Sequence, residues 1–190
     1  PNYAVPPRRT HGGFVVYREN GLDDYRHPTV GAFHDQRLVL AAPQEEPGKL
    51  WFSQVNSIDN FDLYPLPAAH HALTLELAST HLEEIRALVS HHSLLVFTDR
   101  NVWAIDGADR GPIAAGSAVA RIHAKVGSSH IPPLVLGSDV LFTNPLANRI
   151  YRLRYDGRTH SYYAEDVSIF SRHLFQDSAF SGVQAWTAAT

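Results

Sequence analysis

Short apolar runs separated by polar breaks recur along the whole chain. Most of them are about four to six residues long and are bounded by Gly, Pro, Asn or Asp, which is typical of β-strands joined by turns. The runs lie at residues 13–17, 30–33, 37–41, 50–52, 73–77, 85–89, 94–98, 102–105, 134–136, 140–143 and 150–155. Asn20-Gly21, after the first run, is a hairpin turn signal. The pattern predicts an all-β protein of short antiparallel sheets.

Three segments share one internal order, in which a short apolar strand is followed by a stronger apolar strand and then by a strand that carries a large aromatic residue. The stronger strands are Leu38-Val39-Leu40, Leu95-Val96-Phe97 and Val140-Leu141-Phe142. The aromatic residues, Trp51, Trp103 and Tyr151, lie 52 and 48 residues apart. Repeats of about 40–50 residues with about four strands each are typical of β-propeller blades.

We therefore predict about three propeller-like repeats in which the three apolar strands are equivalent. The three aromatic residues are expected to be buried between neighbouring repeats, because large aromatic side chains stabilise such interfaces by packing. The alternative is a β-sandwich whose strands resemble one another only because all strands share a pattern.

Two segments carry helical signals. Asp166 is a suitable N-cap for a segment in which Val167, Phe170 and Leu174 share one face, which predicts one short helix near residues 167–175. Residues 80–83 (THLE) match a capping box just before an apolar run, so we expect one helical turn that leads into a strand. The predicted domains are an extended arm over residues 1–12, a β module over residues 13–182 and the start of a further strand or blade over residues 183–190.

Composition narrows the classes of function. The 190 residues carry a formal net charge of −3, whereas dedicated nucleic-acid binders usually carry a basic excess. Cysteine is absent, which excludes disulfides and zinc–thiolate sites within these residues. No apolar run approaches the ~20 residues of a membrane helix, so we expect no membrane segment. Methionine is also absent, so we expect Pro1 not to be a translation start and the chain to be part of a longer polypeptide.

Histidine is the one enriched reactive residue type, with 12 copies that include the pairs His70-His71 and His91-His92. Neighbouring side chains on a strand point to opposite faces, so neither pair is a natural metal chelate. No zinc motif, phosphate loop or nucleophile elbow occurs. Adjacent carboxylates such as Glu83-Glu84 do not have the separation across a cleft that glycosidases need. We therefore expect that the chain is not an enzyme and holds no cofactor or metal.

Arg149, Arg152 and Arg154 are expected to share one strand of the third repeat. Because side chains alternate along a strand, Arg152 and Arg154 are expected to share one face and Arg149 to lie on the other. A solvated outer face accounts for these residues. The alternative is a patch that faces nucleic acid, which needs arginines to contact phosphates.

An ordered set of short motifs covers most of the chain, from Tyr25 to about Trp186. The set is GAFHDQRLVLA at 31–41, LWFS at 50–53, DNF at 59–61, LELAS at 75–79, IRALV at 85–89, LLVFT at 94–98, Trp103, VLF at 140–142, YD at 155–156, DV at 166–167, HLF at 173–175 and Trp186. In order and spacing it resembles the nozzle or tail-hub proteins of short-tailed bacteriophages, a family also known as tail tubular protein B or DNA stabilisation proteins.

The resemblance implies a virion protein of the phage tail. Identical copies would form a ring of six at the lower end of a short tail, in contact with neighbouring tail and adaptor proteins. The channel of the ring would retain the packaged genome and conduct it during ejection, with transient, non-specific contact to duplex DNA. The alternative function is a carbohydrate-binding or glycan-cleaving β-propeller, such as a tail component that touches the host surface.

Overall fold

The computed structural model describes residues 28–64, 66, 68–170 and 181–183. Strands in this part of the chain form three antiparallel sheets of four strands each. The first sheet consists of β1 (Pro28–His34), β2 (Arg37–Pro43), β3 (Lys49–Phe52) and β4 (Leu73–Glu76). The second consists of β5 (Ile85–Ser90), β6 (Leu94–Thr98), β7 (Val102–Asp106) and β8 (Val119–Ala124). The third consists of β9 (Leu134–Leu136), β10 (Asp139–Thr143), β11 (Ile150–Asp156) and β12 (Ser161–Asp166).

Each sheet is a meander in which every strand pairs with the next strand of the chain, as in a propeller blade. The three apolar strands of the predicted repeat are β2, β6 and β10, the second strand of each sheet. The aromatic positions all fall in the third strand, β3, β7 or β11. The predictions of an all-β fold and of equivalent apolar strands are therefore confirmed.

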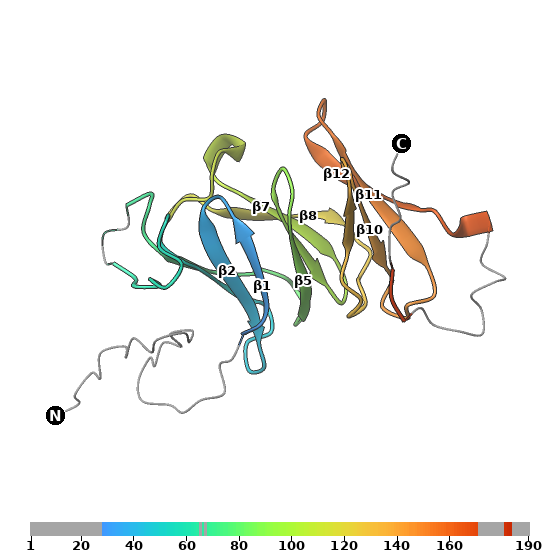
Figure 1. The fold of residues 1–190 in the computed structure, drawn as a ribbon, viewed down its shortest axis with the longest axis horizontal. Helices are drawn as coiled ribbons and strands as arrows, with labels where there is room; N and C mark the ends of the chain where they lie inside the picture. Colours follow the sequence, from blue (N-terminus) through green and yellow to red (C-terminus); the bar gives the residue numbers. More distant parts are fainter. Residues whose placement is uncertain (1–27, 65, 67, 171–180, 184–190) are drawn as a thin grey trace, which may run out of the picture.

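The second sheet lies between the other two (Figure 1). One of its faces packs on the first sheet, and the resulting cluster includes Phe52, Leu94 and Trp103. Its other face packs on the third sheet, in a separate cluster that includes Phe97 and Phe142. Every residue of β6 is buried, because both faces of this strand are covered. Burial on two faces explains why β6 is a continuous apolar run rather than an alternating one.

The three repeated aromatic residues are not equally buried. Trp103 is 4% exposed, as predicted, because β7 lies inside the stack. Trp51 is only half-buried, because it lies on the face of the first sheet that no described strand covers. Tyr151 is also half-buried, although it packs at the inner face of the third sheet with its ring 5.6 Å from that of Phe142. The prediction of burial was therefore wrong for Trp51 and only partly right for Tyr151.

One of the two helical predictions was wrong, and the other lies only partly within the described residues. Residues 80 and 81 form a bend and residues 82–84 are irregular, so the prediction of a helical turn was wrong. Of the helix expected near residues 167–175, the described part contains a turn at 167–168 and 3-10 helical geometry at 169–170, and residues 171–175 lie outside the described part. The arm over residues 1–12, the run at 13–17 and all but Val183 of the further strand over residues 183–190 lie outside it as well. No helix among the described residues has the length and apolar character needed to cross a membrane.

Glu83 explains why the capping-box pattern does not start a helix. The side chain is 3% exposed and accepts hydrogen bonds from Ser79 Oγ (2.5 Å) and Asn101 Nδ2 (2.6 Å) at one oxygen. Its other oxygen accepts from Thr98 Oγ1 (2.6 Å) and Trp103 Nε1 (2.9 Å). Burial alone would raise the pKa of Glu83, but the four hydrogen bonds outweigh it and lower this pKa. The carboxylate thus connects the segment before β5 to the β6–β7 hairpin.

Arg37 plays a comparable part in the first sheet. This arginine has no exposed surface and donates to backbone carbonyls of Ser53 (2.6 Å), His71 (2.8 Å) and Ala69 (2.6 Å). Its Nε donates to the carbonyl of Ile113 at 3.2 Å. One guanidinium therefore holds two long connections, β3–β4 and β7–β8, against the start of β2.

Candidate functional site

The candidate nucleic-acid-facing arginines are placed by β11 and the turn before it. Arg152 and Arg154 lie two residues apart on β11 and therefore share one face of the third sheet, as predicted. That face points away from the stack, because Val140 and Leu153 fill the opposite one. The prediction that Arg149 shares this strand was wrong, because β11 begins at Ile150 and the backbone N–H of Arg149 donates to Asn144 Oδ1 at 2.9 Å in the preceding turn. The structure thus brings two of the three arginines together on an outer face.

Both outer-face arginines have carboxylate partners. Arg152 donates to Glu165 Oε2 at 2.5 Å, and its NH1 lies 3.9 Å from Asp139 Oδ2. Arg154 Nε lies 3.4 Å from Asp139 Oδ1. The hydrogen bond to Glu165 is the main cause that raises the pKa of Arg152. Two positive and two negative side chains therefore balance on this face, which leaves little net charge for phosphate contacts.

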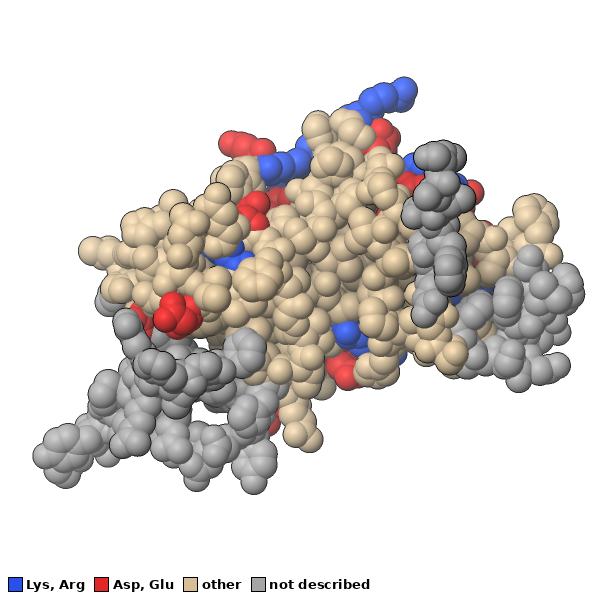
Figure 2. Space-filling model, in the orientation of Figure 1, with Lys and Arg blue, Asp and Glu red and all other residues tan. Residues whose placement is uncertain are grey.

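The face of the molecule drawn in Figure 2 carries both positive and negative side chains. Charged side chains of both signs lie mainly around its edge, and its middle is uncharged. Binding to the phosphate backbone depends on clustered Lys and Arg, so this face would contribute little attraction for DNA.

The outer face of the first sheet has a different character. Phe33 on β1 is 62% exposed, and its cross-strand neighbour is Leu38. Trp51 pairs with Leu40 on the same face, and Lys49 Nζ lies 5.7 Å from the centre of its ring. These residues form an apolar end face, defined by Phe33, Leu38, Leu40 and Trp51. Phe33 is exposed, Leu38 and Trp51 are half-buried, and Leu40 is buried beneath them. An apolar face with an exposed aromatic side chain is typical of a surface that contacts another protein.

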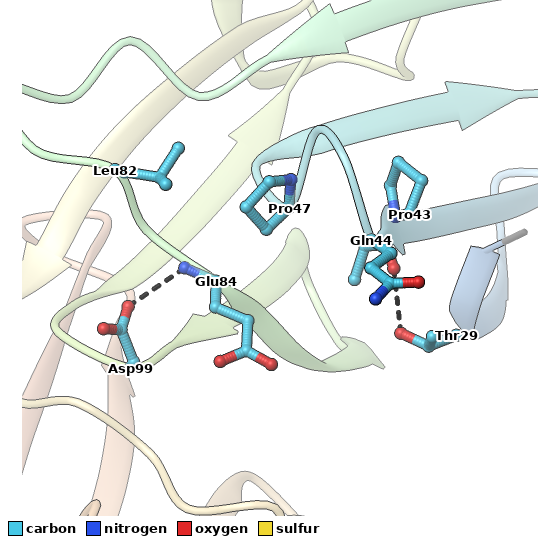
Figure 3. A pocket seen from close by; sticks show the side chains of 8 residues that line it. Thr29, Pro43, Gln44, Pro47, Leu82, Glu84 and Asp99 are labelled. Atoms are coloured by element: carbon cyan, nitrogen blue, oxygen red, sulfur yellow. Dashed lines mark hydrogen bonds between the residues drawn. The ribbon is translucent and has the colours of Figure 1, made fainter. Parts of the chain in front are cut away.

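A groove of about 500 Å³ lies where the β2–β3 hairpin meets the segment before β5 (Figure 3). Its lining residues are Thr29, Ala42, Pro43, Gln44, Pro47, Leu82, Glu84 and Asp99. Asp99 Oδ1 accepts the backbone N–H of Glu84 at 3.0 Å, and Glu84 forms an ion pair with Arg86 at 3.7 Å. No aromatic side chain is among the lining residues, so the groove lacks the stacking platform expected of a glycan site.

The histidine pairs take part in local packing. His71 Nδ1 accepts the backbone N–H of Ala68 at 3.0 Å, and its ring stacks on Tyr64 with centres 4.2 Å apart. His91 and His92 lie at the β5–β6 turn with their rings edge to face. Among the residues that the structure describes, no group of three or more His, Asp or Glu side chains is arranged to hold a metal ion.

Sequence reasoning missed two kinds of residue. Glu83 and Arg37 are buried charged residues whose partners are spread over distant segments, and no sequence pattern indicated that either of them is buried. His123 and Tyr162 meet across the second and third sheets, in strands that the apolar pattern did not predict.

Comparison with known proteins identifies no family for this chain. No model of a protein family matches the chain, and no curated protein matches it. The proposals that follow therefore depend on the fold, on the surfaces described above and on the resemblance of the motifs.

Proposed function

We propose that this chain is a structural module of a short-tailed phage nozzle, whose copies form a ring-shaped channel that retains and conducts the viral genome. The observation that carries the proposal is the stack of three equivalent sheets with an apolar face at one end that no described strand covers. Arrays of repeats normally end in a capping repeat with a polar outer face, so an end sheet with an apolar outer face is expected to contact another molecule.

The two ends of the stack differ in a way that suits contact between copies. The first sheet ends in the apolar face around Phe33 and Trp51, and the third sheet ends in the mixed face around Arg152 and Asp139. A contact between unlike ends of successive copies is heterologous, and a heterologous contact that closes gives a ring. Neighbouring tail and adaptor proteins are the other partners for the same surfaces.

Passage of DNA requires weak, non-specific contact. The ion pairs of Arg152 and Arg154 with Asp139 and Glu165 support weak contact. A guanidinium already paired with a carboxylate neutralises few DNA phosphates, so it releases few counterions and adds little affinity. A wall of this kind lets the genome slide without a sequence preference.

The runner-up function is glycan binding or cleavage, and the groove beside Glu84 and Asp99 is the observation that favours it. Two carboxylates on the wall of a concave site are the minimum that glycosidase chemistry requires. Release of sugar from a bacterial surface glycan by the protein, and its loss in Glu84→Gln, would favour this function over the nozzle.

The test of the nozzle proposal is the state of assembly. We expect light scattering and electron microscopy of the full-length gene product to show ring-shaped oligomers, and Phe33→Asp to shift the protein to monomers. Leu146→Asp is the matched control, because Leu146 is 72% exposed but lies in the β10–β11 connection rather than on the apolar end face. A parent protein that stays monomeric at every concentration, or a Phe33→Asp variant that assembles like the control, would contradict the proposal.

A further inference from the structure

Tyr162 joins the third sheet to the second through both its side chain and its backbone. This residue lies on β12 and is 2% exposed. Its backbone N–H donates to Nδ1 of His123 on β8 at 3.0 Å. Its hydroxyl lies 3.1 Å from Nδ1 of His91 at the β5–β6 turn and accepts the backbone N–H of Ser93 at 3.3 Å. One buried tyrosine is therefore tied to two separate elements of the neighbouring sheet.

The two hydrogen bonds to histidine respond differently to protonation, and the one to His123 requires a neutral ring. A backbone N–H can only donate, so Nδ1 of His123 must carry no proton. When Nδ1 of His91 carries no proton, the hydroxyl of Tyr162 donates to it while accepting from Ser93. An imidazolium has an N–H at both ring nitrogens. At His123 it would set a donor against the N–H of Tyr162, and at His91 it would force the hydroxyl to turn and accept a second hydrogen bond.

We propose that Tyr162, His91 and His123 form an acid-sensitive latch between the second and third sheets, closed while both histidines are neutral and opened when they are protonated. Opening would separate β12 from β8 and loosen the apolar cluster that contains Phe97 and Phe142. The latch is a property of the stack itself and does not depend on ring assembly or on DNA.

The surroundings of His123 favour the neutral form. Burial is the largest influence and lowers the pKa of His123. Arg121 on the same strand and Arg110 in the β7–β8 connection act in the same direction, and Asp106 at the end of β7 opposes them.

The surroundings of His91 also favour its neutral form. Burial again comes first and lowers the pKa of His91, and the neighbouring His92 adds to this effect. A hydrogen bond to the backbone of Gly137 and the charge of Asp139 on β10 oppose it. Tyr155 on β11 packs with the centre of its ring 5.0 Å from that of Tyr162 and 4.5 Å from that of His92.

The direction of the pH effect follows from these pKa values. An unfolded histidine titrates near pH ~6.5, and the two latch histidines resist protonation below that value. The open state therefore binds more protons than the closed state as the pH falls, so acid favours opening. The latch is fully closed above the ordinary histidine pKa and weakens from there downward.

Hydrogen exchange of the Tyr162 amide, followed by NMR, reads the latch directly. After correction for intrinsic exchange, we expect its protection to fall by about tenfold or more between about pH 7.5 and about pH 5, while amides of β6 change less. The double variant His91→Asn/His123→Asn keeps an acceptor near each Nδ1 position that acid cannot protonate at these pH values. Its Tyr162 protection should stay nearly constant. His130→Asn is the control, since His130 is exposed and should leave the parent pH dependence unchanged.

Three results would overturn the latch. One is a Tyr162 amide equally protected at both pH values in the parent. Another is a double variant that loses protection as the parent does. The third does not depend on the variants folding. Ring-proton titration of the parent must place the pKa of His91 and His123 below that of an unfolded histidine, and normal or raised values would refute the proposal.

Discussion

Replacement of Glu83 by glutamine tests how much of the stability depends on one buried carboxylate. The substitution keeps the shape of the side chain and exchanges one acceptor oxygen for an NH₂ group. If that group takes the place of Oε2, it faces the indole N–H of Trp103, which cannot turn into an acceptor. If it takes the place of Oε1, it faces Ser79 and Asn101, which can rotate or flip to accept. Glutamine should therefore adopt the second arrangement.

The magnitude follows from the bonds that change. Hydrogen bonds to a charged group contribute about 1.5–3 kcal/mol each, and all four become bonds to a neutral amide. A neutral amide costs less to bury than a carboxylate, and this difference offsets part of the lost hydrogen-bond energy. We expect Glu83→Gln to reduce the free energy of unfolding by about 2–4 kcal/mol at neutral pH. For a chain of this size that corresponds to a fall in Tm of roughly 5–15 °C.

The assay is urea denaturation at neutral and acidic pH. The lowered pKa of Glu83 means that its stabilisation is complete above the ordinary value of about 4.3 and is lost as the pH falls through the folded value. The difference between parent and variant should therefore shrink in acid. Glu84→Gln is the matched control, because Glu84 is exposed and forms only the ion pair with Arg86. A Glu83→Gln variant as stable as the Glu84→Gln control would refute the reasoning.

Three further predictions concern packing and backbone contacts. Trp103→Ala should lower the free energy of unfolding, measured with denaturant, by about 3–5 kcal/mol. Trp103→Phe removes mainly the indole N–H and should lower it by about 1–3 kcal/mol. Arg37→Lys cannot reproduce the planar fork and should expose residues 54–72 to limited proteolysis at least several-fold faster than in the parent. Gly127→Ala should unfold or strongly destabilise the protein, because the added Cβ would lie 1.9 Å from the carbonyl oxygen of Asp99. Gly137→Ala has open space around it and a φ of +60°, so thermal melting should show a loss of only about 1 kcal/mol.

The apolar pattern predicted all four strands of the first sheet and the first three strands of the other two sheets, but it missed β8 and β12. β8 and β12 lie at sheet edges, where only one neighbouring strand pairs with them. Val119 and Ile122 of β8 are 38% and 42% exposed, and β12 mixes Tyr with Glu and Asp. A strand with so little buried surface needs no clear apolar run, so its sequence resembles that of a loop.

The buried polar groups were beyond prediction for a different reason. Thr80 stands three residues before Glu83, which is the spacing of a capping box, but the carboxylate accepts from Ser79 instead. Its other partners are on the β6–β7 hairpin, and their geometry exists only after the second sheet has formed. His123 and Tyr162 are 39 positions apart and meet through the packing of two sheets. Local patterns predict strands, but they carry no information on how sheets are placed against each other.

The two apolar clusters share no residue, and this separation has a thermodynamic consequence. A change at Phe52 in the first sheet and a change at Phe142 in the third should have additive effects on the free energy of unfolding, since neither contacts the other's cluster. Changes at Leu94 and Phe97 belong to different clusters but share β6, so a double-mutant cycle between them should show coupling. Among the described residues, the packing contacts that connect the first sheet to the third run through β5–β8. A contact made at one end of the stack would therefore change the stability of the other end through the central sheet.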